Sequence, residues 1–274
     1  MDFKILFRHD KNILDEYFEC SQIIPTFDSR IDCANSLVIA RYSCLPFYKE
    51  LEEDLNKLNS RLINTYQEHR YIANFEYYND VEKYTFKTYF SFEELPENKS
   101  FVVKGRTNSR KHKWNSMMFA KDKRTAIEIG LSLMDDALTS EQGIIIREYE
   151  ELETFEYAIN GLPITNEWRL FFFGDELIDY GYYWSNIDDM KHIDNARQDF
   201  IENGLSFAKH IASIIKNKTN FFVVDIAKTC LGEWKLVEIN DGQMSGLSMI
   251  DPKSFYLKLN DALIASMDKS LSVS

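Results

Sequence analysis

The chain has 274 residues and a formal net charge of −12, with 45% hydrophobic and 28% charged residues. This is the composition of an ordinary globular protein, and the length suits one large domain or two small ones. The acidic balance argues against general nucleic-acid binding, because neutralising phosphates requires clustered cations. No apolar run approaches the roughly 20 residues of a membrane span, and the stretch MDFKILFRHD lacks a signal-peptide core, so we expect a cytoplasmic protein.

Residues 1–80 are expected to form an α/β unit. The apolar runs FKILF and SLVIARYS are typical of strands separated by polar breaks. Arg41 follows the second run, at the place where open α/β sheets present ligand-binding groups, although an exposed arginine beginning a loop is an alternative. After Pro46, an apolar stripe at helical spacing predicts a packing helix; it consists of Phe47, Leu51, Leu55 and Leu58.

A cationic loop follows the next clear strand, Phe101 to Lys104. Five lysines and arginines lie within residues 104–113 of this acidic protein. A lysine at a strand end beside a flexible loop suits the phosphates of a nucleotide, whereas the loop could equally be a solvated face or a patch for an acidic partner. Asp122 is expected to cap a helix whose packing stripe is Ile127, Leu131, Met134 and Leu138.

Two later segments suggest nucleotide chemistry. The apolar strand GIIIREYEELE ends in acids and could offer a flat slot for a purine, although any buried strand before a charged turn has the same pattern. Next, RLFFF and LIDYGYY form a hairpin with its turn at Gly174 and Asp175. Arg169 beside aromatic residues is either a structural ion pair with Glu167 or a clamp for a phosphoryl group oriented by Glu167.

A second hairpin carries the predicted metal ligands. FFVVDI and EWKLVEIN flank Leu231 and Gly232, and a turn centred there places Asp225 opposite Glu238, with Asn240 on the same face. A three-residue loop with a bulge would displace this pairing by one residue, and an edge hairpin with solvated carboxylates is the plain alternative. Facing carboxylates repel each other, and an all-oxygen set suits Mg²⁺.

Two helices flank this hairpin. The first covers about residues 196–216, and its predicted packing face is Ile201, Leu205, Ala208, Ala212 and Ile215. The second is capped by Asp251, and its predicted packing face is Phe255, Leu259, Leu263 and Met267.

Taken together, these motifs resemble the ATP-grasp superfamily. The matching features are Asp225, the E-x-N of Glu238 and Asn240 before a Gly/Ser loop, the V-V-K ending in Lys104, and the E-x-R-x-F strand of Arg169. The resemblance implies an α/β (α+β) fold with a pre-grasp domain at 1–80 and an ATP-grasp domain at 81–274. The latter would divide into a small lid subdomain (81–147) and a metal-binding subdomain (148–274).

The resemblance also implies cofactors and roles. ATP and Mg²⁺ would be bound, with Asp225, Glu238 and Asn240 as metal ligands and Lys104 and Arg169 acting on the phosphates. Residues expected around the nucleotide are Arg106, Lys87 or Lys83, Glu148 and Tyr149 at adenine, and Glu151, Glu150 or Glu153 at the ribose. Ser245, Gly246 and Arg41 would meet the second substrate.

The implied activity is ATP-dependent ligation of a carboxylate to an amine or a thiol through an acyl phosphate. The expected partners are a small-molecule or peptide carboxylate and an amine, with no membrane partner. The sequence identifies neither substrate nor an oligomeric state. Two alternatives are a phosphotransferase of the same superfamily and a nucleotide-binding interaction module without turnover.

Overall fold

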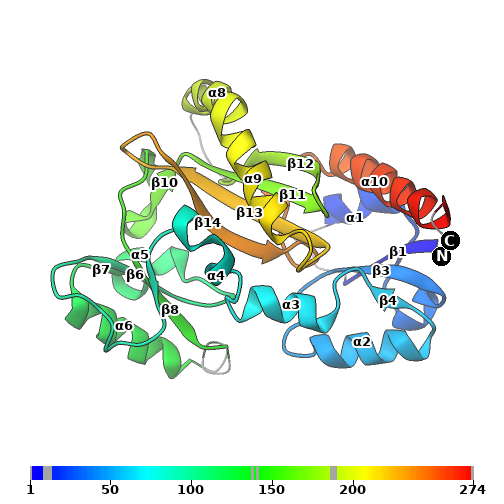
Figure 1. Cartoon of the computed structure of the whole chain (residues 1–274), viewed down its shortest axis with the longest axis horizontal. Helices are drawn as coiled ribbons and strands as arrows, with labels where there is room; N and C mark the ends of the chain where they lie inside the picture. The colour runs from blue at the N-terminus through cyan, green and yellow to red at the C-terminus, as the bar shows by residue number, and fades with distance from the viewer. Residues whose placement is uncertain (1, 9–13, 137–138, 140–141, 186–189, 273–274) are drawn as a thin grey trace.

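The computed structural model describes residues 2–8, 14–136, 139, 142–185 and 190–272. Three four-stranded sheets and one two-stranded ribbon organise this part of the chain, with helices packed around them (Figure 1). The N-terminal sheet, the small sheet and the central sheet follow one another along the sequence. The expected mixed α/β class is confirmed.

The N-terminal sheet has the order β2-β1-β3-β4 with every pair parallel. Its strands are β1 (Asp2–Phe7), β2 (Thr26–Phe27), β3 (Ser36–Arg41) and β4 (Arg61–Leu62), and the helices of this region are α1 (Leu14–Ser21), α2 (Tyr48–Lys57), α3 (Tyr66–Ala73) and α4 (Tyr78–Val81). The predicted packing of Phe47 is wrong, since its side chain is 60% exposed and the buried ring of Tyr48 takes its place. Leu51 and Leu55 are buried as predicted.

The small sheet is antiparallel, in the order β5-β8-β6-β7. Its elements are β5 (Thr88–Tyr89), β6 (Phe101–Gly105), α5 (Trp114–Met117), β7 (Phe119–Ala120), α6 (Lys123–Met134) and β8 (Ile144–Glu148). Asp122 caps α6 as predicted, because its Oδ1 accepts the N–H of Thr125 at 2.8 Å.

The predicted packing face of α6 is wrong. Leu131 and Met134 are 53% and 48% exposed, and the buried residues are Ala126, Ile129, Gly130 and Leu133. The reason is close approach: the ring of Phe92 lies 2.6 Å from where a Cβ of Gly130 would stand. A stripe of large apolar residues ignores the small residues that allow such contact, and Leu138 lies outside the described residues.

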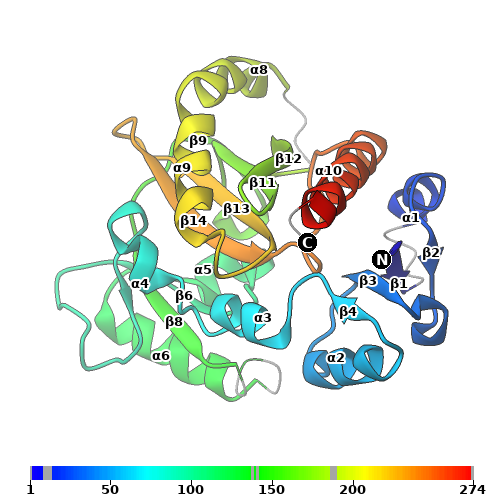
Figure 2. The ribbon, with the colours of Figure 1, turned by 45° about the vertical axis from the view of Figure 1, so that its right-hand side comes forward.

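The central sheet is antiparallel, in the order β12-β11-β13-β14. Its strands are β11 (Glu167–Phe173), β12 (Glu176–Tyr182), β13 (Phe221–Lys228) and β14 (Trp234–Asp241), and it is preceded by the ribbon of β9 (Thr154–Tyr157) and β10 (Pro163–Thr165). The other face from α9 packs partly on α10 (Pro252–Ser272), which also contacts α1 (Figure 2).

A π-helical turn changes the packing face of the helix before β13. The helix runs through α8 (Met190–Asp199), the π-helix Phe200–Gly204 and α9 (Leu205–Ile215). A π-turn inserts an extra residue and rotates what precedes it. Ile201 is therefore 43% exposed, contrary to the prediction, whereas Ala208, Ile211 and Ile215 are buried. On α10, Phe255, Leu259 and Leu263 are buried as predicted.

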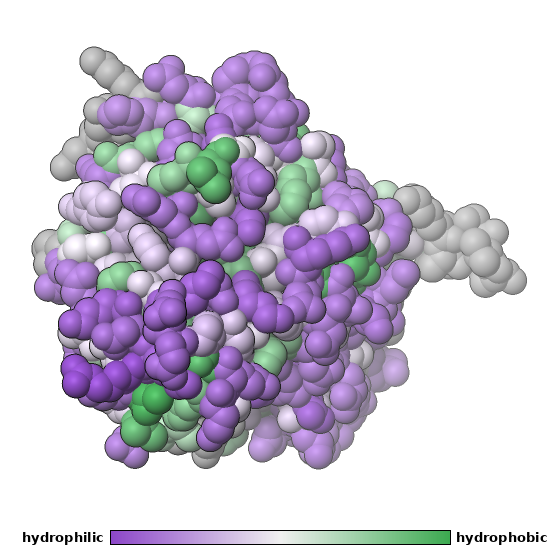
Figure 3. All heavy atoms as spheres, turned by 60° about the vertical axis from the view of Figure 1, so that its left-hand side comes forward, coloured by the Kyte–Doolittle hydropathy of each residue, from purple (hydrophilic) through white to green (hydrophobic). Residues whose placement is uncertain are grey.

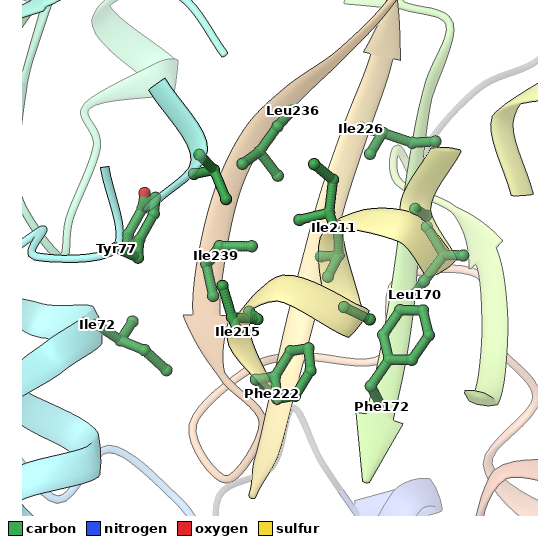
Figure 4. Close-up of a cluster of buried hydrophobic side chains, with 14 of the residues drawn as sticks. Ile72, Tyr77, Leu170, Phe172, Ile211, Ile215, Phe222, Ile226, Leu236 and Ile239 are labelled. Atoms are coloured by element: carbon green, nitrogen blue, oxygen red, sulfur yellow. The ribbon is translucent and has the colours of Figure 1, made fainter. Parts of the chain in front are cut away.

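Polar residues dominate the surface. The face shown in Figure 3 is largely hydrophilic, with apolar groups in small, separate areas. The apolar side chains gather inside instead, as Figure 4 shows for Leu170 and Phe222 of the central sheet against Ile211 of α9. None of the helices in the described ranges is long and apolar enough to cross a membrane. The four cysteines are free thiols, as expected; Cys20, Cys33 and Cys44 are buried and Cys230 is exposed.

Candidate active site

The β13–β14 hairpin brings the predicted metal ligands together. Asp225 pairs with Glu238 across the ladder, and Asn240 lies two residues further along the same strand. The N–H of Thr229 donates to Glu233 O at 2.8 Å and closes a three-residue loop. This loop displaces the pairing near it by one residue, and a bulge directly after Asp225 restores it. Both predicted alternatives therefore occur in one hairpin, and the two carboxylates still face each other.

Arg169 extends this row of charged residues onto β11. It pairs with Asp225 in the sheet, and its Nε and Nη2 donate to Oδ1 and Oδ2 of Asp225 at 2.9 and 2.8 Å. Its Nη1 donates to Gly246 O at 2.9 Å. Burial opposes the charge of Arg169, but the Asp225 carboxylate raises its pKa. The orienting partner is thus Asp225, and the prediction that Glu167 has this role is wrong.

Glu238 forms an ion pair that joins two sheets. Lys104, at the end of β6 in the small sheet, donates through Nζ to Glu238 Oε2. Burial alone would raise the pKa of Glu238, but the ammonium groups of Lys104 and Lys111 lower it well below its ordinary value. Glu238 is therefore a carboxylate, and Lys104 is oriented toward the metal-ligand row.

Lys111 reaches the site from the cationic loop after β6. Its Nζ donates to Tyr183 Oη at 2.6 Å and lies 3.9 and 4.6 Å from the ring centroids of Tyr183 and Trp184. The loop is fastened to the β9–β10 ribbon, because Asn160 Nδ2 donates to His112 O at 2.8 Å. The sequence singled out the cations of this loop as a group. Lys111 had no local signal that set it apart from them.

Glu167 is the third carboxyl group of the site. Its side chain is buried, and burial, with the charges of Asp225 and Glu238, raises its pKa to about 7 despite the opposing charge of Lys111. A carboxyl group that titrates near neutral pH can hold or release a proton during a reaction.

A cleft of about 830 Å³ opens between the small sheet and the central sheet. This volume is within the range of small-molecule sites. Its apolar lining includes Phe86, Val102, Met118, Leu152 and Val237. It also contains Lys104, Lys111, Glu167 and Glu238, so an apolar slot and a charged cluster share one cleft.

The strand β8 and its continuation form one wall of this cleft, as the purine-slot pattern predicted. Glu148 and Tyr149 line it, and their backbone N–H groups donate to Lys87 O and Ser100 O, each at 2.8 Å. Of the three carboxylates considered for a ribose, Glu150 lines the cleft. Glu151 is exposed and Glu153 accepts a hydrogen bond from Asn166 at 2.9 Å; neither is in the lining.

Three other predicted nucleotide contacts lie outside the cleft lining. Lys87 pairs with Glu82 at 2.7 Å, and its side chain is 53% exposed. Lys83 lies 4.8 Å from the ring centroid of Tyr84. The guanidinium of Arg106 lies 6.0 Å from the ring centroid of Phe90, within the small-sheet region.

A second hollow contains all three residues predicted to meet the other substrate. Arg41, Ser245 and Gly246 line it together with Arg8 and Glu16. Arg41 is only 5% exposed, so the alternative of an exposed loop arginine is wrong. It pairs with Glu16 at 2.6 Å and donates to the carbonyls of residues 242 and 243. Because Arg169 also binds Gly246 O, the loop after β14 connects this hollow with the charged row.

The donor set suits magnesium. Asp225 and Glu238 offer carboxylate oxygens, and Asn240 donates through Nδ2 to Asp225 Oδ2 at 3.1 Å, which leaves its carbonyl oxygen to act as a ligand. A group of three or more His, Cys, Asp or Glu side chains with metal-binding geometry is absent from the described ranges. Two carboxylates and one amide are a small protein set, and Mg²⁺ accepts such sets because it keeps several waters and takes phosphate oxygens.

Comparisons with known proteins agree on the fold. An ATP-grasp domain family, the third family of its clade, matches residues 94–259. The solved D-cycloserine synthetase DcsG is similar at 12% identity over 95% of this chain and 99% of that one, with a TM-score of 0.56. For N5-carboxyaminoimidazole synthase from Aspergillus clavatus, in complex with ADP and 5-aminoimidazole ribonucleotide, the values are 11%, 94%, 76% and 0.56.

The ATP-grasp ligase PsnB, complexed with a minimal precursor, Mg and ADP, is similar at 8% identity over 96% of this chain and 97% of that one, with a TM-score of 0.52. A search of curated proteins found no match.

Proposed function

Because the chain belongs to this ATP-grasp domain family, we propose that it is an ATP-dependent ligase that joins a carboxylate to an amine through an acyl phosphate. The observation that carries this proposal is the convergence of Lys104, Arg169 and the Asp225–Glu238–Asn240 set at a cleft that also has an apolar slot. The similar solved proteins named as a synthetase, a synthase and a ligase support the same class.

The cleft divides into a base end and a phosphate end. We place the adenine in the apolar slot beside Glu148 and Tyr149, with the ribose near Glu150. Lys104 and Lys111 come from the small sheet and its loop, and they would hold the phosphates. Tyr183 and Trp184 hold the Lys111 ammonium in place before the nucleotide binds.

The magnesium ligands would be Asp225, Glu238 and Asn240. When bound, Mg²⁺ bridges phosphate oxygens and neutralises charge that develops during phosphoryl transfer. Arg169 keeps Asp225 ionised and oriented through its paired hydrogen bonds. Lys104 does the same for Glu238.

The acid would bind in the second hollow, at the loop that connects Arg41 with Arg169. One carboxylate oxygen attacks the γ-phosphorus, the bond from that phosphorus to the bridging oxygen breaks, and ADP leaves. The amine then attacks the acyl carbon, the bond from carbon to the phosphate oxygen breaks, and the amine's extra proton goes to the released phosphate. The protein mainly positions these groups and stabilises their charge.

The test is product analysis with a panel of carboxylic acids and amines. ADP and phosphate should be released only when an acid is present, and the amide should be detected by mass. Hydroxylamine should trap the acyl phosphate as a hydroxamate. Phosphorylated acceptor without amide would instead indicate a phosphotransferase, and Mg²⁺-ATP binding without ADP release would indicate a binding module.

Two variants test the metal assignment. Glu238→Ala and Asn240→Ala should abolish turnover while the protein stays folded, because each removes one proposed ligand. Glu233→Ala is the matched control, since Glu233 is an exposed carboxylate at the tip of the same hairpin. Unchanged turnover in both ligand variants would remove the assignment.

A further inference from the structure

Arg147 is a buried cation of the cleft that the proposed reaction has not used. It lies on β8, lines the cleft and is only 5% exposed. Its Nη1 donates to Val237 O and its Nη2 to Thr85 Oγ1. The guanidinium lies 4.9 Å from the ring centroid of Phe86. The chain has thus fixed this side chain from three directions.

The charge of Arg147 lacks compensation within the protein. Its hydrogen-bond partners are a carbonyl and a hydroxyl, and no ion pair to it occurs among the residues of the described ranges. Its Nε is a buried atom without a hydrogen-bond partner in that part of the chain. A buried charge without a counter-ion is costly, and a free donor in a cleft can be satisfied by an anionic ligand.

The register places Arg147 relative to the other groups of the cleft. Arg147 pairs with Val102 on β6, two residues before Lys104, so Arg147 and Lys104 project from the same face of the small sheet. Arg147 also directly precedes Glu148 and Tyr149, the wall at which the base is placed. A cation between the base wall and Lys104 faces the part of a nucleotide that joins base and ribose to the outer phosphates.

We propose that Arg147 binds the α-phosphate of the nucleotide, as the inner partner of Lys104. This proposal rests on the proposed nucleotide site. It also assigns the role for which Lys83 and Lys87 were candidates. Lys87 is paired with Glu82, and both lysines lie outside the cleft lining. The free Nε–H and the remaining N–H bonds of the guanidinium supply the donors for the phosphate oxygens.

The test compares adenosine, AMP and ADP by calorimetry in wild-type protein and in Arg147→Met. The variant should bind AMP and ADP roughly 10- to 100-fold more weakly, the value of one or two charge-assisted hydrogen bonds. Its affinity for adenosine should stay within about twofold, since adenosine has no phosphate for Arg147 to bind. Equal losses for adenosine and AMP would overturn the proposal in favour of a structural or base-binding role.

Lys87→Met is the matched comparison, because it removes a cation from the neighbouring strand segment. Its affinity for AMP should equal that of wild-type protein; a loss in Lys87→Met together with none in Arg147→Met would also overturn the proposal. If Arg147→Met does not fold, Arg147→Lys keeps the charge but loses the planar fork. Its loss should again be larger for AMP than for adenosine, and equal losses would count against the α-phosphate contact.

The two proposals fail in different ways. Wild-type protein that binds neither ADP nor AMP would refute the proposed function itself. Wild-type protein that binds both, with an Arg147→Met variant that binds AMP equally well, would refute only the role of Arg147.

Discussion

Replacing Arg169 with methionine should destabilise the protein strongly, because it would leave Asp225 charged and buried. Asp225 is completely buried, and it accepts two hydrogen bonds from Arg169, at 2.9 and 2.8 Å, and another from Asn240. Removing one partner of a buried ion pair costs about 3–5 kcal/mol, a large part of the roughly 5–15 kcal/mol by which domains are typically stable.

The measurement is the free energy of unfolding in urea at neutral pH. Arg169→Met should lose about 3–5 kcal/mol. The double variant Arg169→Met/Asp225→Leu should lose less than the sum of the two single variants, since it leaves neither charge unpaired. Mg²⁺-ATP should recover part of the stability of Arg169→Met, because a metal ion bound to Asp225 would restore a counter-charge.

Three results would refute this reasoning. A loss below about 1 kcal/mol in Arg169→Met would be the value of an exposed ion pair and not of a buried one. Losses that add up in the double variant would mean that the two side chains act independently. Stability that Mg²⁺-ATP leaves unchanged in Arg169→Met, while it raises that of wild-type protein, would separate Asp225 from the metal site.

Two further predictions concern Glu167 and the helix over the central sheet. The folded-state pKa of Glu167, about 7, exceeds its ordinary 4.5, so the folded protein keeps a proton that the unfolded chain loses. The free energy of unfolding should therefore fall as the pH rises from about 4.5 to 7, by up to about 3 kcal/mol, and Glu167→Gln should remove this part of the pH dependence; superimposable pH profiles would contradict it. Ile211→Ala should cost about 2–5 kcal/mol in urea unfolding because it opens a cavity. Ile201→Ala, its control at a 43% exposed position, should cost less than about 1 kcal/mol, and the reverse order would show that the assigned packing face is wrong.

Much of the charged row could be predicted from the sequence because strand geometry is local. Alternation places Asn240 on the face of Glu238, and a hairpin places Glu238 opposite Asp225. The predicted pairing survived a three-residue loop only because a bulge compensated for it. Helix faces were less predictable, as the exposed Leu131 and Ile201 show, since they depend on close approach of small residues and on a π-turn.

The sequence by itself determined the strands, the facing carboxylates, and the presence of cations near residue 104. Only the tertiary structure decided which cations enter the cleft: it brings in Lys111 and Arg147 and leaves Lys87 paired on the surface. The physical reason is that the cleft forms between two sheets whose strands are distant in the chain. Propensity and alternation act over a few residues, whereas the meeting of Lys104 with Glu238, 134 residues apart, depends on how the sheets pack.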